Sequence, residues 1–216
     1  MAKHVYPSDI YTESPAAEAD TLSNLGPLQP MAGTWKGLAG SDVNPKADGP
    51  EYNGYTETIE MTVIDRQLNG PQLFYGLRYH QFINNPEEEA TFHDQVGYFL
   101  WEPETKTVIQ TLAIPRGQIA MAMGTAEPDA TEFELIAKRG SVVNGICSNP
   151  FLEEAFRTPE FRCKIKILSE DSWSYEYTTV LEPRGDSSPF NHIDQNTLVR
   201  VSAPQPNPLL LKAEAK

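Results

Sequence analysis

Hydrophobic and polar residues alternate along most of the chain between residues 33 and 202. In 162–167, for example, Cys163, Ile165 and Ile167 alternate with arginine and lysine side chains. A period of two places successive side chains on opposite faces, which is typical of a strand with one buried face. The strands that this pattern predicts occupy 33–38, 58–64, 71–82, 92–101, 106–114, 118–126, 131–139, 162–167, 173–180 and 194–202.

Turn-forming residues separate these strands at even spacing, as in Asn69–Gly70–Pro71 and Glu127–Pro128–Asp129. About ten evenly spaced strands are typical of an antiparallel barrel or sandwich. We therefore expect an all-β fold, a lipocalin-like β-barrel of about ten antiparallel strands with one short helix.

The short helix is predicted within 148–156. Asn149 can cap its first turn and Pro150 suits its first position. Glu153 would face Arg157 four residues later.

The two ends of the chain are richer in proline than the middle. Residues 1–25 predict an extended leader, although 18–25 can form a short helix, and 26–203 predict the ligand-binding barrel. Residues 204–216 predict a proline-rich extended tail, whose leucines at 209–211 can dock on the barrel surface.

Composition excludes several classes of function. The chain has 17 Lys+Arg against 30 Asp+Glu, a formal net charge of −13, which argues against nucleic acid and anionic membrane surfaces as partners. No apolar run approaches the roughly 20 residues of a membrane-spanning helix, and the start of the chain has no secretory signal. Cys147 and Cys163 are expected to be reduced thiols, and the expected location is cytoplasmic.

Three histidines lie in or beside predicted strands. His80 shares a strand face with Arg78, and His192 lies just before the last strand. His93 shares a face with Gln95, Gly97 and Phe99, whereas Asp94, Val96 and Tyr98 lie on the opposite face of the same strand. Each histidine can equally be an ordinary hydrogen-bonded structural residue. The H-x-H spacing of cupin metal sites, the G-x-S-x-G elbow and phosphate-binding loops are absent.

The first strand carries a motif that resembles the nitrobindin family of haem-binding β-barrels. In that family this strand reads approximately G-x-W-x-G-x-G-x-G followed by proline, and Gly33, Trp35, Gly37, Gly40 and Pro45 match it, with altered glycine spacing after Gly37. The resemblance implies a barrel in which Trp35 packs across one end.

A second motif lies at 93–99, which is similar to the nitrobindin segment H-x-E-x-G-Y-F. The resemblance implies that the face of His93, Gln95, Gly97 and Phe99 points into the barrel, while Asp94, Val96 and Tyr98 point out. It also implies that His93 lines the distal side of a haem pocket and that His192 is the axial ligand of the haem iron, although the spacing from His192 to Leu198 is longer than in the family. On this basis the predicted cofactor-binding residues are His192, His93, Trp35, Gly37, Phe99 and His80, with His192 as the metal ligand.

Nitrobindins hold haem b, bind nitric oxide and isomerise peroxynitrite to nitrate. The resemblance therefore implies haem b as cofactor, a small-molecule ligand in the barrel and peroxynitrite isomerisation as an activity. The native ligand and the oligomeric state stay open, and a homodimer is one alternative.

Two other functions stay open. The protein can be a lipocalin-like or fatty-acid-binding-like carrier of a small hydrophobic ligand without haem, with Arg78 or Arg116 meeting a carboxylate. It can also be an enzyme that uses histidines with Tyr79 or Tyr98 as acid–base groups.

Overall fold

The computed structural model describes residues 7–85 and 91–214, except for the side chain of Glu214. The first six residues of the expected leader and the last two of the expected tail lie outside the described residues.

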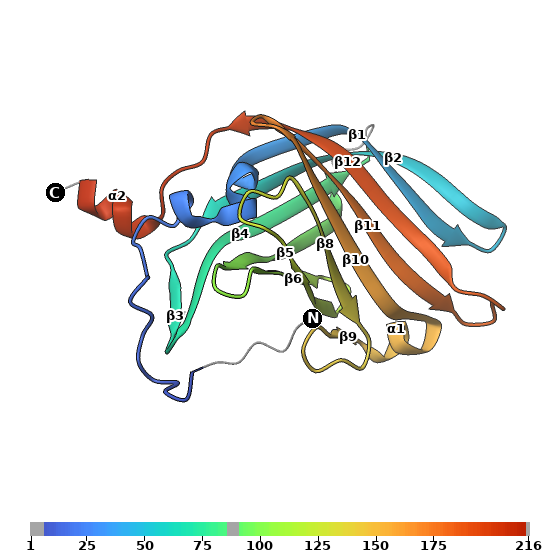
Figure 1. Ribbon diagram of the computed structural model, residues 1–216. Coiled ribbons are helices and arrows are strands. Elements are labelled where there is room, and N and C mark those ends of the chain that lie inside the picture. Colours follow the sequence, from blue (N-terminus) through green and yellow to red (C-terminus); the bar gives the residue numbers. More distant parts are fainter. Residues whose placement is uncertain (1–6, 86–90, 215–216) are drawn as a thin grey trace.

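Ten of the described strands close into an antiparallel barrel (Figure 1). They follow the order β2-β1-β12-β11-β10-β8-β7-β6-β5-β4, and the pairing of β2 with β4 closes the ring. The expected all-β barrel is confirmed. The strands are β1 (Gly33–Lys46), β2 (Gly49–Val63), β3 (Gln67–Asn69), β4 (Gln72–Asn84), β5 (Thr91–Glu102), β6 (Thr107–Ile114), β7 (Gln118–Thr125), β8 (Glu132–Lys138), β9 (Ile146–Ser148), β10 (Phe156–Ser169), β11 (Ser172–Pro183) and β12 (Phe190–Ser202).

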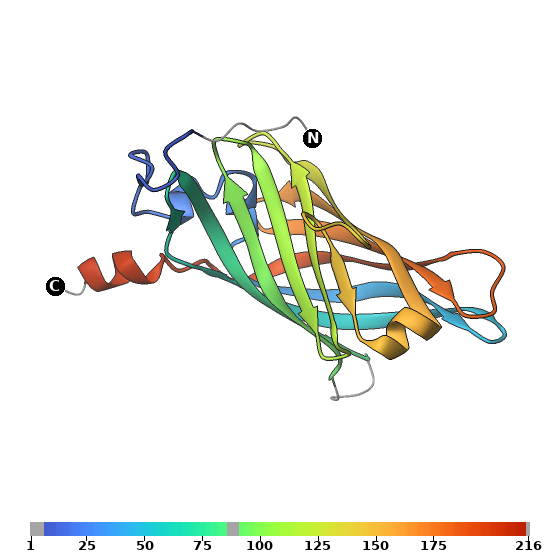
Figure 2. The same ribbon diagram turned by 90° about the horizontal axis from the view of Figure 1, so that it is seen from below.

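The two short strands lie outside the ring. β3 pairs with β4 and β9 pairs with β7. The tips of the β1–β2 and β11–β12 hairpins extend beyond the other strands, at the right of both Figure 1 and Figure 2. We call this the open end of the barrel.

The opposite, closed end is covered by two short 3-10 helices, η1 (Leu22–Asn24) and η2 (Gly26–Met31). Leu25, Leu28 and Met31 are fully buried there. Prolines at positions 27 and 30 suit a short 3-10 helix because it leaves some N–H groups unused.

Trp35 packs across the closed end, as expected. Its indole Nε1 donates a 2.8 Å hydrogen bond to the carbonyl oxygen of Met31, and its ring meets Trp173 edge-on at 5.9 Å between centroids. Arg200 lies over the same ring, with its guanidinium carbon 4.2 Å from the centroid. These contacts tie η2 to the barrel wall.

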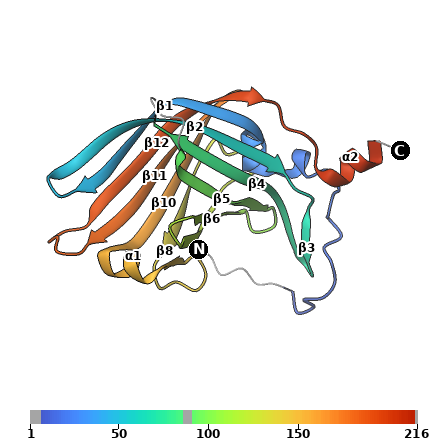
Figure 3. The same cartoon turned by 180° about the vertical axis from the view of Figure 1, so that it is seen from behind.

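The C-terminal tail is not extended throughout. Helix α2 (Pro208–Glu214) ends the described chain and projects from the closed end (Figure 3). Pro208 suits the first helical position, and the carbonyl of Asn207 accepts the first bonds of the turn from Leu210 and Leu211. The helix therefore begins at the last proline of the tail.

Helix α1 (Pro150–Ala155) confirms the predicted cap, because the side chain of Asn149 accepts a 3.1 Å hydrogen bond from the Leu152 amide. The expected pairing of Glu153 with Arg157 is wrong. The helix ends before Arg157, which lies in β10, and Glu153 instead binds Arg139 through both guanidinium Nε and Nη2.

Within the described part of the chain, no helix is long and apolar enough to cross a membrane. Cys147 is exposed and Cys163 is buried, and both are free thiols, as expected.

Candidate functional site at the open end of the barrel

Strand β5 carries the predicted inward face. Gln95 and Phe99 are buried, whereas Val96 and Tyr98 are exposed, so the predicted alternation is confirmed. The partners of Gln95 and Phe99 on β4 are Gln81 and Leu77, which are buried as well.

His93 lies on this inward face near the open end, opposite Ile83 of β4. Desolvation lowers the pKa of His93, the charges of Arg116 and His192 lower it further, and Asp194 and a hydrogen bond with Gln95 partly oppose them. Its imidazole is therefore neutral at pH 7, and a neutral imidazole can donate a lone pair to a metal.

His192 faces inward from β12, opposite Thr179 of β11. Its Nε2 lies 2.8 Å from Oδ1 of Asp42 and 3.3 Å from Oδ2 of Asp194. Desolvation lowers the pKa of His192, but the contacts with the Asp194 and Asp42 carboxylates outweigh it and raise this pKa to about 10.

The two inward histidines therefore differ in their fitness to bind haem iron. His192 is an imidazolium held by two carboxylates, and an imidazolium has no free lone pair at either nitrogen. His93 has the neutral ring that an axial ligand requires. The residues present fit haem at His93 better than at His192.

A buried carboxylate occupies the middle of the barrel. Glu57 of β2 accepts hydrogen bonds from Gln81 Nε2 at 2.7 Å, Tyr175 Oη at 2.8 Å and Asn196 Nδ2 at 2.7 Å. Burial raises the pKa of Glu57 to about 7 although these three bonds oppose the shift. The Tyr55 hydroxyl extends the network with a 2.8 Å bond to Tyr175.

Further buried polar side chains continue this network toward β6. Tyr79 accepts a 2.8 Å hydrogen bond from Gln95, and the amide of Gln110 lies 3.4 Å from the hydroxyls of both Tyr79 and Tyr177. Large hydrogen-bonded polar side chains thus span the middle of the barrel.

Two glycines of β1 make room for this network. A Cβ at Gly37 would lie 2.2 Å from Nδ2 of Asn196, and a Cβ at Gly40 would lie 2.2 Å from the Tyr55 ring. The space beside Gly37 and Gly40 is therefore occupied by two side chains of the same barrel, Asn196 and Tyr55.

The remaining predicted cofactor-binding residues lie elsewhere. Trp35 is at the closed end, and Phe99 is buried against Tyr79 with ring centroids 5.2 Å apart. His80 lies on the outer face of β4, where its Nε2 is 2.9 Å from Asp94 Oδ1. Because alternate residues of β4 face opposite sides, His80 does not share the interior with His93 and His192.

The sequence did not single out Asp42 or Glu57, whereas Asp194 could be expected to contact His192 because it lies two residues later. A signal for Glu57 was present, because it shares a strand face with the apolar residues Ile59, Met61 and Val63. The contact of Asp42 with His192 joins strands far apart in the sequence, and no local pattern reveals it.

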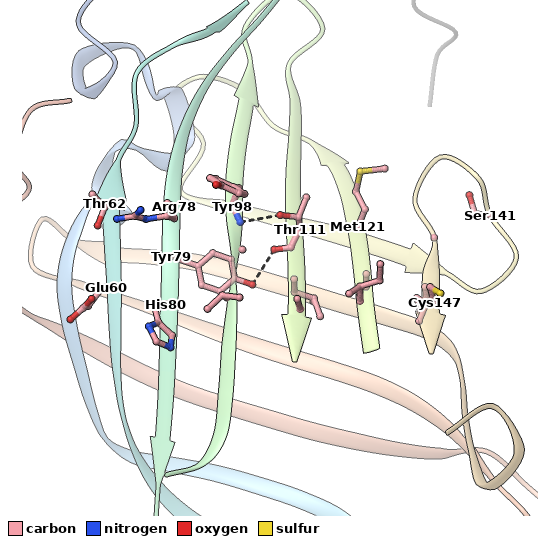
Figure 4. Close-up of a pocket in the computed structure, with 18 residues that line it drawn as sticks. Glu60, Thr62, Arg78, Tyr79, His80, Tyr98, Thr111, Met121, Ser141 and Cys147 are labelled. Atoms are coloured by element: carbon pink, nitrogen blue, oxygen red, sulfur yellow. Dashed lines mark hydrogen bonds between the residues drawn. The ribbon is translucent and has the colours of Figure 1, made fainter. Parts of the chain in front are cut away.

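The outer face of the barrel carries a groove of about 810 Å³ beside His80 (Figure 4). It crosses β2, β4 to β7 and β9, and its lining includes Arg78, Tyr98, Met121 and Cys147. The groove lies on the opposite side of the sheet from the interior network, so it is separate from the open end.

Comparisons with known proteins give one family. The family model described as "THAP4-like, heme-binding beta-barrel domain" matches residues 24–200. Among solved structures, Rv2717c from M. tuberculosis is similar with a TM-score of 0.57 and 21% sequence identity, over 83% of this chain and 96% of that one. This likeness shows the barrel fold.

A search of the curated proteins finds no match. The family model nevertheless spans most of the chain, from the start of the closed end to the last strand of the barrel. The protein therefore belongs to the family of THAP4-like, haem-binding β-barrel domains.

Proposed function

We propose that the protein binds haem b without a covalent link at the open end of its barrel, with the imidazole of His93 as the iron ligand. The observation that carries this proposal is the inward-facing, neutral imidazole of His93, whose pKa burial lowers. Covalent attachment of haem uses a C-x-x-C-H motif, which the sequence lacks.

The charges around His93 suit an anionic macrocycle. Haem carries two carboxylates, and Arg116 and His192 are the cations whose charges act on His93. His192 is paired with both Asp42 and Asp194, so of these two cations Arg116 is the one that suits a haem carboxylate. The axial role of His192 that the resemblance implies stays a prediction, and it requires His192 to release its proton and two carboxylates.

Haem held by His93 would supply an iron atom that can bind a small ligand. Nitric oxide binding and isomerisation of peroxynitrite are the finer functions that we propose for it. The similarity of the motifs at 33–45 and 93–99 to those of nitrobindins supports these two functions.

Our proposal includes a cytoplasmic location, which the two free thiols support. It also includes a small molecule as the partner. The alternative function as a carrier of an apolar ligand is less well supported, because hydrogen-bonded polar side chains fill the middle of the barrel.

The experiment is a haemin titration of the purified protein, read by the Soret band. We expect one haemin per chain in the wild type, loss of the band in His93→Ala, and an unchanged band in His80→Ala, which removes a histidine of the outer face. Ile119→Gln changes the outer groove and controls for haemin that adheres there.

Three results would overturn the proposal. The first is a wild type that takes up no haemin. The second is a His93→Ala variant that keeps the wild-type band while His192→Ala loses it, which would make His192 the ligand. The third is loss of uptake in Ile119→Gln alone, which would place the bound haemin in the groove.

A further inference from the structure

The backbone brings three potential metal ligands together at the open end. Asp42 of β1 and Asp194 of β12 are directly paired across the two strands. His192 precedes Asp194 by two residues and therefore points to the same side of the sheet. The positions of these side chains are set by strand register rather than by a loop.

The ligand atoms of the three residues converge. Nε2 of His192 lies 2.8 Å from Asp42 Oδ1 and 3.3 Å from Asp194 Oδ2, and all three atoms lie within 4.8 Å of one another. Three donor atoms at such distances can bind one ion placed between them.

Asp42 provides a second, independent observation. Its side chain is 9% exposed, and Oδ2 is held by a 2.8 Å hydrogen bond from Asn44 Nδ2. Oδ1 is buried and accepts no hydrogen bond from any described residue, since its contact with His192 is an ion pair without hydrogen-bond geometry. An oriented, buried carboxylate thus points at His192 an oxygen that has an ion pair but no hydrogen bond among the described residues.

The outer face offers a contrast. His80 Nε2 lies 2.9 Å from Asp94 Oδ1 in a regular hydrogen bond, and both side chains are more exposed than those of His192 and Asp42. That pair has one carboxylate, and the two side chains share one hydrogen bond. The cluster at the open end has two carboxylates around a single imidazole.

We propose that Asp42, His192 and Asp194 bind one divalent transition-metal ion, through two carboxylate oxygens and one imidazole nitrogen. Imidazole together with carboxylate suits Zn²⁺, Mn²⁺ or Fe²⁺ rather than Ca²⁺ or Mg²⁺, which take oxygen ligands. Two carboxylates balance the charge of the ion, and His192 releases its proton to solvent when the metal binds.

The site is accessible and incomplete, as a reactive metal site must be. The side chains of His192 and Asp194 are 29% and 24% exposed, so an ion can enter from the open end. Three protein ligands leave at least one position for water or a small molecule. The site uses no atom of His93, so it goes beyond the proposed haem function and does not depend on it.

The test is a calorimetric titration of the metal-stripped full-length protein with Zn²⁺, with elemental analysis after desalting. We expect one Zn²⁺ per chain and a proton release of about one per ion, measured in two buffers of different ionisation enthalpy. Asp194→Asn and His192→Ala should each weaken Zn²⁺ binding at least tenfold. The controls Asp94→Asn and His80→Ala should bind Zn²⁺ like the wild type.

The His93→Ala variant separates this proposal from the haem proposal. It should lose haemin and keep Zn²⁺, whereas Asp194→Asn should keep haemin and lose Zn²⁺. Melting curves of each variant check that it is folded, and Asp42→Asn serves in place of any variant that is not. Absence of Zn²⁺ binding in the wild type, unchanged binding in both site variants, or equal loss in the outer-face controls would overturn the proposal.

Discussion

Asn196 donates a 2.7 Å hydrogen bond to the carboxylate of Glu57 by passing over the bare backbone of Gly37. The three residues lie on three adjacent strands, β12, β1 and β2. The relationship explains why the first strand needs a glycine at this point. It also links a residue of a family motif to a buried charge.

Gly37→Ala should therefore destabilise the barrel. The new Cβ would lie 2.2 Å from Asn196 Nδ2 and 2.9 Å from a Leu198 methyl, so Asn196 must move and Glu57 loses a partner. Leaving a buried charged group short of one hydrogen bond costs about 1–3 kcal/mol, which urea denaturation would detect as a lower midpoint. Gly54→Ala is the matched control, because its Cβ would meet only a carbonyl oxygen at 3.9 Å. Equal stability of the two variants would contradict this account of Gly37.

The unfolding free energy should fall as pH rises from 4.5 to about 7. Glu57 has an ordinary pKa of 4.5 in the unfolded chain and about 7 in the folded protein, because desolvation outweighs its bonds with Gln81, Tyr175 and Asn196, and the charge of Asp194 adds to the rise. The folded state thus keeps a proton that the unfolded state releases in this range, which favours the folded state at low pH.

The Glu57→Gln variant tests this dependence. A shift of about 2.5 pKa units corresponds to a loss of about 3 kcal/mol between the two ends of the range. The difference in unfolding free energy between wild type and variant should change by this order across pH 4.5–7 and stay constant above it. Glu60→Gln, on the exposed face of the same strand, should show no such change. A constant difference for Glu57→Gln would mean that its folded pKa is ordinary.

The strands of the barrel could be predicted because their alternation is local. Cys163 and Ile165 are fully buried, and the inward face of β5 is the predicted one. The helix at 150–155 was also predictable, because Asn149 and Pro150 are local signals. The partner of Glu153 was not predictable, because Arg139, which directly follows β8, comes close to Glu153 only in the folded barrel.

The site was less predictable because it depends on contacts between distant strands. Alternation alone could not assign an inward or outward face to His80, and the structure places it outside. A glycine indicates space beside its own backbone, but it does not indicate what occupies that space. Beside Gly37 and Gly40 the space is occupied by the polar side chains of Asn196 and Tyr55. Asp194 lies on the same strand as His192, but the Asp42 carboxylate reaches His192 through the pairing of the first and last strands.

Arg200→Lys should loosen the closed end. The guanidinium of Arg200 donates to the backbone oxygens of Pro30 and Ala32 at the end of η2, and it stacks on Trp35. A lysine cannot make the forked contact or stack in the same way. We expect a loss of about 1–3 kcal/mol in unfolding free energy and faster amide exchange in residues 28–32.

The control for this change is Arg184→Lys. Arg184 pairs with Glu154 on the surface, where both side chains are about 70% exposed. An exposed ion pair contributes little, so this variant should stay within about 0.5 kcal/mol of the wild type. If the two variants lose the same stability, the contacts of Arg200 with η2 are not what holds the closed end.

Asn207→Ala should release both ends of the chain together. Asn207 is fully buried, its Oδ1 accepts a 3.1 Å hydrogen bond from the amide of Thr21, and its Nδ2 donates a 2.7 Å bond to Asp65 Oδ1. One side chain thus joins the leader, the tail and the segment after β2. Without it, limited proteolysis should cut before residue 21 and after residue 203 faster than in the wild type, while the barrel stays folded. Gln205→Ala, which changes an exposed neighbour, should be cut at the wild-type rate. Faster cutting at only one end would mean that the leader and the tail are held independently.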